Sequence, residues 1–116
     1  MPSDSPAARL KDIRDNIELA FSFIGESTLD QFLTDAKTVY AVTRCLEIIS
    51  EASRRLPPEL KERHPHIRWQ GMAGAGNVYR HDYEQVLDRG VWDTVQHSLK
   101  PLLAVVQEEL RRLAAG

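Results

Sequence analysis

The segment VYAVTRCLEIISEASRRL, from Val39 to Leu56, decides the fold class of this chain. Apolar or small residues recur along it at steps of three and four, namely Val39, Val42, Leu46, Ile49, Ser53 and Leu56. Because an α-helix makes one turn in about 3.6 residues, this spacing places them all on one face. The segment therefore predicts a long helix that packs against a partner helix and ends at Pro57-Pro58.

Two helices are predicted before this segment. Ser5-Pro6 is typical of an N-cap followed by the first helical residue, and apolar residues then recur at helical spacing up to Gly25. Thr28 and Gln31 have the spacing of a capping box, in which each side chain bonds the backbone N–H of the other residue. We expect a first helix that stops at Gly25 and a short second helix that begins after Thr28.

Further helical elements are predicted after the long helix. The stretch from Pro57 to Trp69 holds three prolines, which indicates a loop with one helical turn at Glu59 to Arg63. A helix is expected from about Pro65 to His81. The three-and-four spacing then returns from Trp92 to Leu113, with a bend expected at Pro101, which lacks a backbone N–H.

These elements together predict an all-α fold. No alternating strand pattern occurs in the sequence, and 116 residues are enough for one modest core. We therefore expect a single domain over residues 1–116, built as an antiparallel up-and-down bundle of four to five helices.

Composition and charge limit the function classes. A net charge of −2 and a pI near 6.1 give no overall basic field for nucleic acid or a membrane. The single cysteine, Cys45, lies in a helical pattern and has no partner for an intrachain disulfide. No apolar run reaches the roughly 18 residues of a membrane span. A soluble cytoplasmic protein is expected, with no membrane partner and no cofactor.

His64 and His66 have a spacing that could suggest a metal site. No Cys, Asp or Glu near them in the sequence completes a ligand set. We therefore interpret both as solvated histidines beside Pro65 and predict no metal.

A polar stripe shares the long helix with the apolar one. Its members also step by three or four and project together: Tyr40, Arg44, Glu47, Glu51 and Arg55. Such a stripe is commonly a solvated face with ion pairs, and Glu51 is well placed to pair with Arg55. The other interpretation is a polar wall that faces a functional groove.

The glycines of GAGNVYRHDY, residues 74–83, do not form a nucleotide loop. The pattern Gly71-x-x-Gly74-x-Gly76 lacks a preceding strand, and Tyr79 stands where a dinucleotide-binding turn needs glycine. Glycines within a helix each cost about 1 kcal/mol relative to alanine. They indicate either the close approach of another backbone or a ligand, or tight packing against Trp69 or Trp92.

The polar end of the same segment concentrates chemistry. Asn77 and His81 share a helical face, and Tyr83 converges on it only if the helix ends near His81. An imidazole can act as general acid or base, and the guanidinium of Arg80 can hold a phosphate. These residue types fit phosphoryl transfer or phosphodiester cleavage, and they also fit a surface polar cluster.

The sequence resembles the HepT-like members of the HEPN superfamily, small helical proteins encoded beside minimal nucleotidyltransferases. The resemblance covers nearly the whole chain and rests on four segments: Ala41 to Pro57, Ile67-x-Trp69, Gly76 to Tyr83, and Val91 to Leu103. It implies a bundle that forms a two-fold homodimer with a shared cleft. It further implies a metal-independent ribonuclease toxin whose antitoxin is the neighbouring nucleotidyltransferase.

The family motif is Arg, four to six residues, His, any residue, Tyr. His81 matches the histidine and Tyr83 the tyrosine, but Gly76 stands where the commoner family phrase has arginine. The missing arginine would stabilise charge on the scissile phosphate. Arg80, adjacent to His81, or Arg44, on the polar stripe, is predicted to take its place.

The resemblance also suggests supporting roles and an alternative function. Glu47 and Glu51 are expected to fix the arginines, and Asn77 to support RNA binding. In related systems the nucleotidyltransferase attaches adenylate to the motif tyrosine, which makes Tyr83 a candidate acceptor. A chain that lacks the motif arginine could then serve as a non-catalytic binding partner of the antitoxin.

Overall fold

The computed structural model describes residues 5–72 and 84–116, with the side chains of residues 84–87 also outside the description. Within these ranges every regular element is a helix, which confirms the all-α class. The helices are α1 (Pro6–Ile24), α2 (Leu29–Leu33), α3 (Ala36–Arg54), α4 (Pro58–Glu62), α6 (Glu84–His97) and α7 (Leu99–Ala115). A further helical turn occupies residues 69–72.

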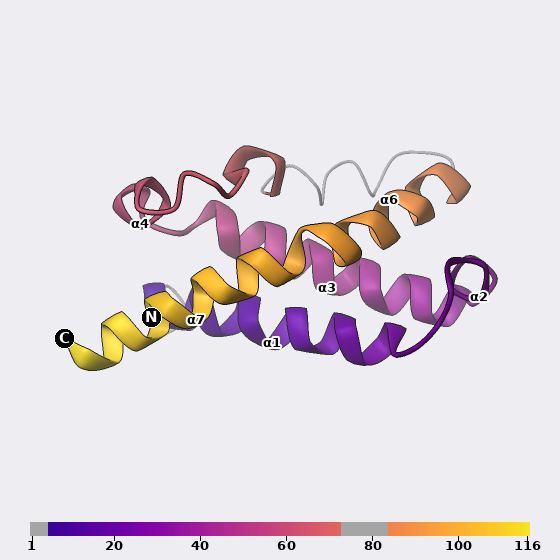
Figure 1. The fold of residues 1–116 in the computed structure, drawn as a ribbon, viewed down its shortest axis with the longest axis horizontal. Helices are drawn as coiled ribbons and strands as arrows, with labels where there is room; N and C mark the ends of the chain where they lie inside the picture. The colour runs from indigo at the N-terminus through magenta and orange to yellow at the C-terminus, as the bar shows by residue number, and fades with distance from the viewer. Residues whose placement is uncertain (1–4, 73–83) are drawn as a thin grey trace.

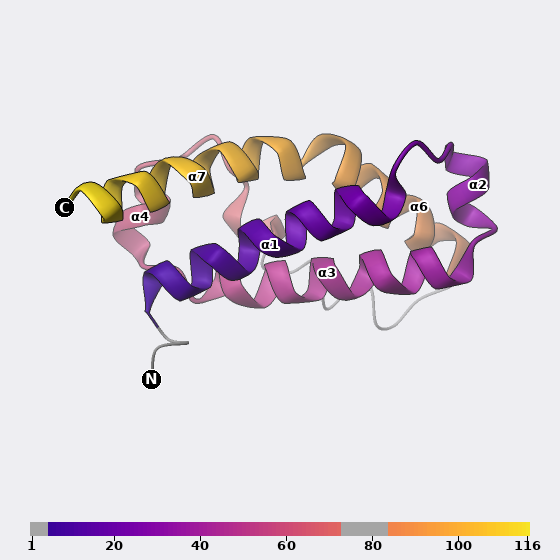
Figure 2. The same ribbon diagram turned by 90° about the horizontal axis from the view of Figure 1, so that it is seen from below.

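The long helices form an elongated bundle of 46 × 29 × 27 Å. Helices α1 and α3 run antiparallel along the length of the molecule, and α6 and α7 follow one another along the same bundle (Figures 1 and 2). The short helices α2 and α4 lie at opposite ends, where the chain enters and leaves α3. The bundle architecture predicted from the sequence is confirmed.

The predicted helix boundaries follow from local bonds. The hydroxyl of Ser5 accepts from the N–H of Ala8 at 3.1 Å and caps α1. Gly25 ends α1 with φ of 54°, in the left-handed region that glycine adopts without a Cβ clash. Thr28 and Gln31 form both bonds of the predicted capping box, at 2.9 and 3.2 Å.

The core lies where the apolar stripes of α1, α3 and α7 meet. All six members of the predicted α3 stripe are buried, as is Cys45. Burial raises the pKa of the Cys45 thiol, so the cysteine serves as a small apolar core residue. Phe32 of α2 packs against Trp92 of α6 with ring centroids 5.4 Å apart, which joins one end of the bundle.

The last predicted helix is divided in two. Helix α6 ends at His97 and α7 begins at Leu99, and Pro101 lies in the first turn of α7. Because proline offers no backbone N–H, the bond that would reach back to the carbonyl of His97 is missing. The expected bend is thus a junction at Ser98. The apolar stripe also ends earlier than predicted, since Leu113 near the end of α7 is exposed.

Candidate functional site

Five of the predicted site residues lie outside the described residues: Gly76, Asn77, Arg80, His81 and Tyr83. Gly74 lies there too, whereas Gly71 is described. Among the described residues, a Cβ built on Gly71 meets only the Cβ of Arg68, at 3.8 Å, so no described backbone approaches Gly71 closely. The described structure places Arg44, Glu47 and Glu51, together with the framework that holds the chain just before residue 73.

The polar stripe of α3 is a solvent-facing row of ion pairs. The guanidinium of Arg44 lies 3.6 Å from the Glu47 carboxylate. Glu51 bonds Arg54 at 2.9 Å and Arg55 at 2.8 Å, and the Arg55 bond holds the pKa of Glu51 below its usual value. The predicted pairing of Glu51 with Arg55 is confirmed. Exposed pairs of this kind each contribute only about 0.3–0.5 kcal/mol to stability.

The same stripe borders a groove between α1 and α3. A hollow of about 240 Å³ is lined by Arg9 and Asp12 of α1 and by Arg44, Glu47 and Glu51 of α3. Tyr40 continues the stripe and is 74% exposed. The two interpretations drawn from the sequence are therefore compatible, because the ion-paired face is also one wall of a polar groove.

Ser50 ties α3 to the chain that leads into the motif. Its hydroxyl donates to the carbonyl of Met72 at 2.7 Å in a buried environment. Met72 is the last described residue before the segment that carries His81. Ser50 lies about 100° around the helix from Glu51. The helix with the polar stripe thus also fixes the start of the motif segment.

Ser50 and Ser53 give a matched test of this tether. Both are buried on α3, but among the described residues the Ser53 hydroxyl finds no hydrogen-bond partner. Ser50→Ala is expected to lower the free energy of unfolding by about 1 kcal/mol, because it removes a buried hydrogen bond to the carbonyl of Met72. Ser53→Ala should leave stability unchanged or raise it slightly. Denaturant unfolding of both variants checks this, and equal losses would contradict the tether.

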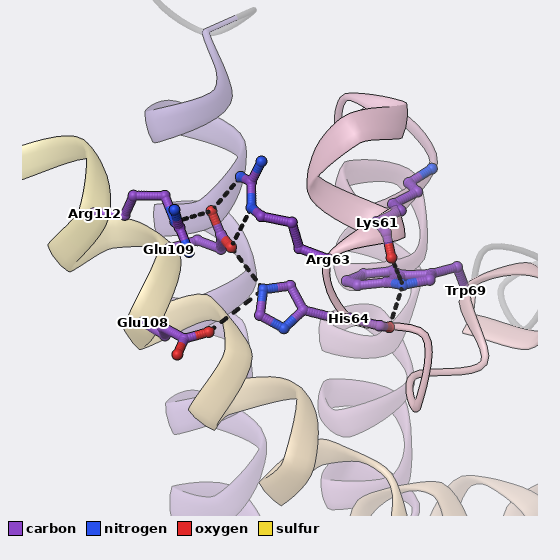
Figure 3. A network of polar contacts seen from close by, with 7 residues as sticks. All are labelled: Lys61, Arg63, His64, Trp69, Glu108, Glu109 and Arg112. Carbon is purple, nitrogen blue, oxygen red and sulfur yellow. Dashed lines mark hydrogen bonds and ion pairs between the residues drawn. The ribbon is translucent and has the colours of Figure 1, made fainter. Parts of the chain in front are cut away.

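A buried ion-pair network joins the segment after α4 to α7 (Figure 3). Glu109 of α7 is only 1% exposed. Both its oxygens accept from Arg63, at 2.6 and 3.1 Å, and one lies 2.6 Å from Nε2 of His64. Arg112 lies 3.6 Å away. The Arg63 hydrogen bonds, followed by the His64 bond, lower the pKa of Glu109 to about 2.

The Trp69 side chain bonds back to the backbone of the residues that precede it. The indole N–H of Trp69 donates to the carbonyls of Lys61 and His64, at 3.2 and 3.1 Å (Figure 3). The N–H of Ile67 donates to the carbonyl of His64 at 3.2 Å. These bonds fold residues 61–69 into a compact loop. The helix expected from Pro65 therefore begins later, at residue 69, and its predicted part beyond residue 72 lies outside the described residues.

The prediction of two solvated histidines is wrong for His64 and correct for His66, which is exposed. His64 instead lies buried beside two carboxylates of α7, those of Glu108 and Glu109. Glu109 lies 45 residues further along the chain. His64, Glu108 and Glu109 place their ligand atoms within 4.8 Å of one another. Because Arg63 already occupies both oxygens of Glu109, we assign this cluster to an ion-pair network rather than to a metal site.

Comparisons with known proteins agree on one family. The model of the family described as Ribonuclease HepT-like matches residues 13–109. A relative from Thermococcus cleftensis, named "Probable ribonuclease HepT", is 42% identical over 103 residues, which cover 89% of this chain and 93% of its own. A relative from Methanocaldococcus jannaschii, whose name describes a candidate RNase, is 32% identical over 96% of this chain and 92% of its own.

No solved structure matches the chain. Among the described helices, none combines the length and apolar character needed to cross a lipid bilayer.

Proposed function

The chain belongs to the HepT-like ribonuclease family, and from this premise we propose that it is a metal-independent endoribonuclease. The observation that carries the proposal is the family match over residues 13–109, which includes the motif residues His81 and Tyr83. The described framework supports it, because Ser50 and the Glu109 network hold the chain on the N-terminal side of that motif.

The proposed reaction is attack of a ribose 2′-hydroxyl on the neighbouring phosphorus. His81 accepts the proton of the 2′-hydroxyl as general base. The new O2′–P bond forms as the P–O5′ bond breaks, and the departing 5′-oxygen takes up a proton. The products are a 2′,3′-cyclic phosphate and a 5′-hydroxyl end. Tyr83 orients the histidine or the RNA, and Asn77 supports RNA binding.

An arginine must neutralise the developing charge on the phosphate, since Gly76 replaces the usual one. Arg44 suits this role because 71% of its side chain is exposed, it borders the groove, and its ion pair with Glu47 is long, at 3.6 Å. Arg55, by contrast, is held by Glu51 at 2.8 Å. Arg80 is the other candidate, adjacent to His81 in the sequence.

A matched pair of variants tests the role of Arg44. Arg44→Ala is expected to slow cleavage of single-stranded RNA about 100-fold, the effect of removing one positioned electrostatic donor. Arg55→Ala removes the same charge from the same stripe and should leave the rate within about twofold. Initial rates under single-turnover conditions give the comparison. If Arg80→Ala abolishes cleavage and Arg44→Ala does not, the phosphate role belongs to Arg80.

A two-fold homodimer belongs to the same proposal. Leu19, Phe23 and Tyr40 are large hydrophobic side chains exposed on α1 and α3, the helices that border the groove. A dimer through this region would hide them and bring two copies of Arg44 together. A monomeric mass in solution at micromolar concentration would remove this part of the proposal.

The second candidate function is that of a binding partner for a minimal nucleotidyltransferase antitoxin. Gly76 favours it, because a chain without the motif arginine could persist without ribonuclease activity. In this role Tyr83 accepts adenylate from ATP, with release of pyrophosphate. Mass spectrometry after incubation with the neighbouring nucleotidyltransferase and ATP detects the modification, and an unmodified Tyr83 would count against it.

A further inference from the structure

A second hollow lies away from the polar groove of α3. It measures about 320 Å³ and is enclosed between residues 66–72 and the junction of α6 with α7. His66, Arg68 and Met72 line one side, and Thr94, His97 and Pro101 line the other. A volume of this order is at the small end for ligand pockets. A single nucleotide unit is a ligand of about this size.

The junction of the two helices accounts for the hollow. Pro101 interrupts the backbone bonding between α6 and α7, and Gly71 contributes no side chain opposite it. A Cβ added to Gly71 would meet no described atom closer than 3.8 Å. Among the described residues, the space is bounded by side chains from separate parts of the chain.

The polar lining of this hollow is suited to an anion. Arg68 brings a guanidinium, and His66 and His97 bring imidazoles, while none of the described residues that line it carries a carboxylate. This composition is unusual in a chain with a net charge of −2. The hydroxyl proton of Thr94 is already donated to the carbonyl of Gly90 at 2.9 Å. Recognition of an anion therefore falls to Arg68 and the two imidazoles.

The remaining lining is apolar. Ile67 and Met72 are buried residues whose surfaces reach the hollow, and Pro101 faces them from α7. A planar base can pack against such side chains while its phosphate accepts hydrogen bonds from the Arg68 guanidinium and the two imidazoles. The combination of one anionic group and one flat apolar group describes a nucleotide.

We propose that this hollow is a subsite for one nucleotide of the RNA, in which Arg68, His66 and His97 bind a phosphate and Met72 and Pro101 contact the base. The inference rests on the proposed ribonuclease function. It adds a second place where RNA would contact the chain. Met72 lines this place and directly precedes, in the sequence, the segment that carries His81. The Ser50 hydroxyl holds the backbone of Met72, which lines the hollow.

Binding of an uncleavable RNA tests the subsite. The probe is a short single-stranded oligoribonucleotide with every 2′-hydroxyl methylated, and fluorescence anisotropy gives its affinity for the wild-type chain. Arg68→Ala is expected to weaken binding about tenfold, the effect of losing one charge-assisted contact. The slope of log affinity against log salt should fall by about 0.7. Arg14→Ala, on α1 and paired only with its neighbour Asp15 in the described contacts, should change neither value.

A second variant keeps the charge and fills the space. Gly71→Leu meets no close atom of the described residues at its Cβ and lies within a helical turn, so it is expected to fold and to weaken RNA binding at least tenfold. Wild-type affinity in both Arg68→Ala and Gly71→Leu would overturn the subsite. If the wild-type chain still cleaves RNA, the proposed function survives that result.

Adenosine 5′-monophosphate separates a free nucleotide from an RNA chain. The chain could bind both probes through Arg68 and yet cleave no RNA. That result would support the hollow as a nucleotide site and overturn only the proposed ribonuclease function. Arg68-dependent binding of the mononucleotide without any binding of the oligonucleotide would overturn the RNA subsite.

Discussion

Replacing Glu109 with alanine is expected to lower the free energy of unfolding by about 3 kcal/mol. The carboxylate is buried, and its loss leaves both Arg63 and His64 without their shared partner. Removing one member of a buried ion pair costs about 3–5 kcal/mol, and the lower end applies because the Arg63 side chain is 39% exposed. Urea unfolding followed by circular dichroism measures the loss.

Glu108 provides the control for this prediction. It is the preceding residue on α7, its side chain is 54% exposed, and it lies 3.5 Å from Nε2 of His64. Glu108→Ala removes the same charge and should cost less than about 1 kcal/mol. Similar losses in the two variants would show that the buried position of Glu109 confers no special stability.

The same network has a pH signature. The pKa of Glu109 is lowered from 4.5 to about 2 in the folded chain, so its ionised form stabilises the fold. This contribution is complete above about pH 4.5 and is lost as the pH falls toward 2. A shift of this size corresponds to roughly 3 kcal/mol. The wild type should lose this much more stability than Glu109→Ala across the window.

Replacing His81 with alanine is expected to slow RNA cleavage by about 10²- to 10⁴-fold, the usual contribution of a general base. The imidazole is the group proposed to remove the 2′-hydroxyl proton. Arg14→Ala is a suitable control, because Arg14 lies on α1 and belongs neither to the motif nor to the proposed RNA subsite. It should leave both RNA binding and the rate of cleavage unchanged.

Local signals were sufficient to predict most of the fold. Three features that end or begin helices involve residues within one helical turn of one another: the Ser5 cap, the capping box of Thr28 and Gln31, and the turn at Gly25. Such local features can be predicted from short sequence patterns. The buried stripe from Val39 to Leu56 required only helical periodicity. The missing N–H of Pro101 predicted a bend in the last helix, where the structure has a junction at Ser98 between α6 and α7.

The contacts of Ser50 with Met72 and of His64 with Glu109 could not be predicted in this way. His64 meets Glu109 across 45 residues, and Ser50 meets Met72 across 22, so neither contact has a sequence pattern. One signal was available for Glu109, which lies three residues after the buried Val106 on the inward face of α7. A carboxylate on a buried face requires a cationic partner, and this requirement points to a basic segment elsewhere in the chain.

Part of the candidate site could be predicted from the sequence, and the rest is seen in the structure. Arg44, Glu47 and Glu51 were placed on one face by periodicity alone, and the structure adds the groove beside them. The hollow at Arg68 and His97 depends on how residues 66–72 pack against the junction of α6 with α7. Its members are far apart in the sequence, so only the tertiary structure brings them together.

Cleavage of single-stranded RNA in the presence of excess EDTA tests the central claim most directly. The wild-type chain and His81→Ala are purified in parallel and incubated with the same labelled RNA, and the ends of the products are identified. The wild type is expected to give fragments with 2′,3′-cyclic phosphate and 5′-hydroxyl ends, with little or no cleavage by His81→Ala. An inactive wild type, or equal cleavage by the two proteins, would show that the chain is not a ribonuclease that depends on His81.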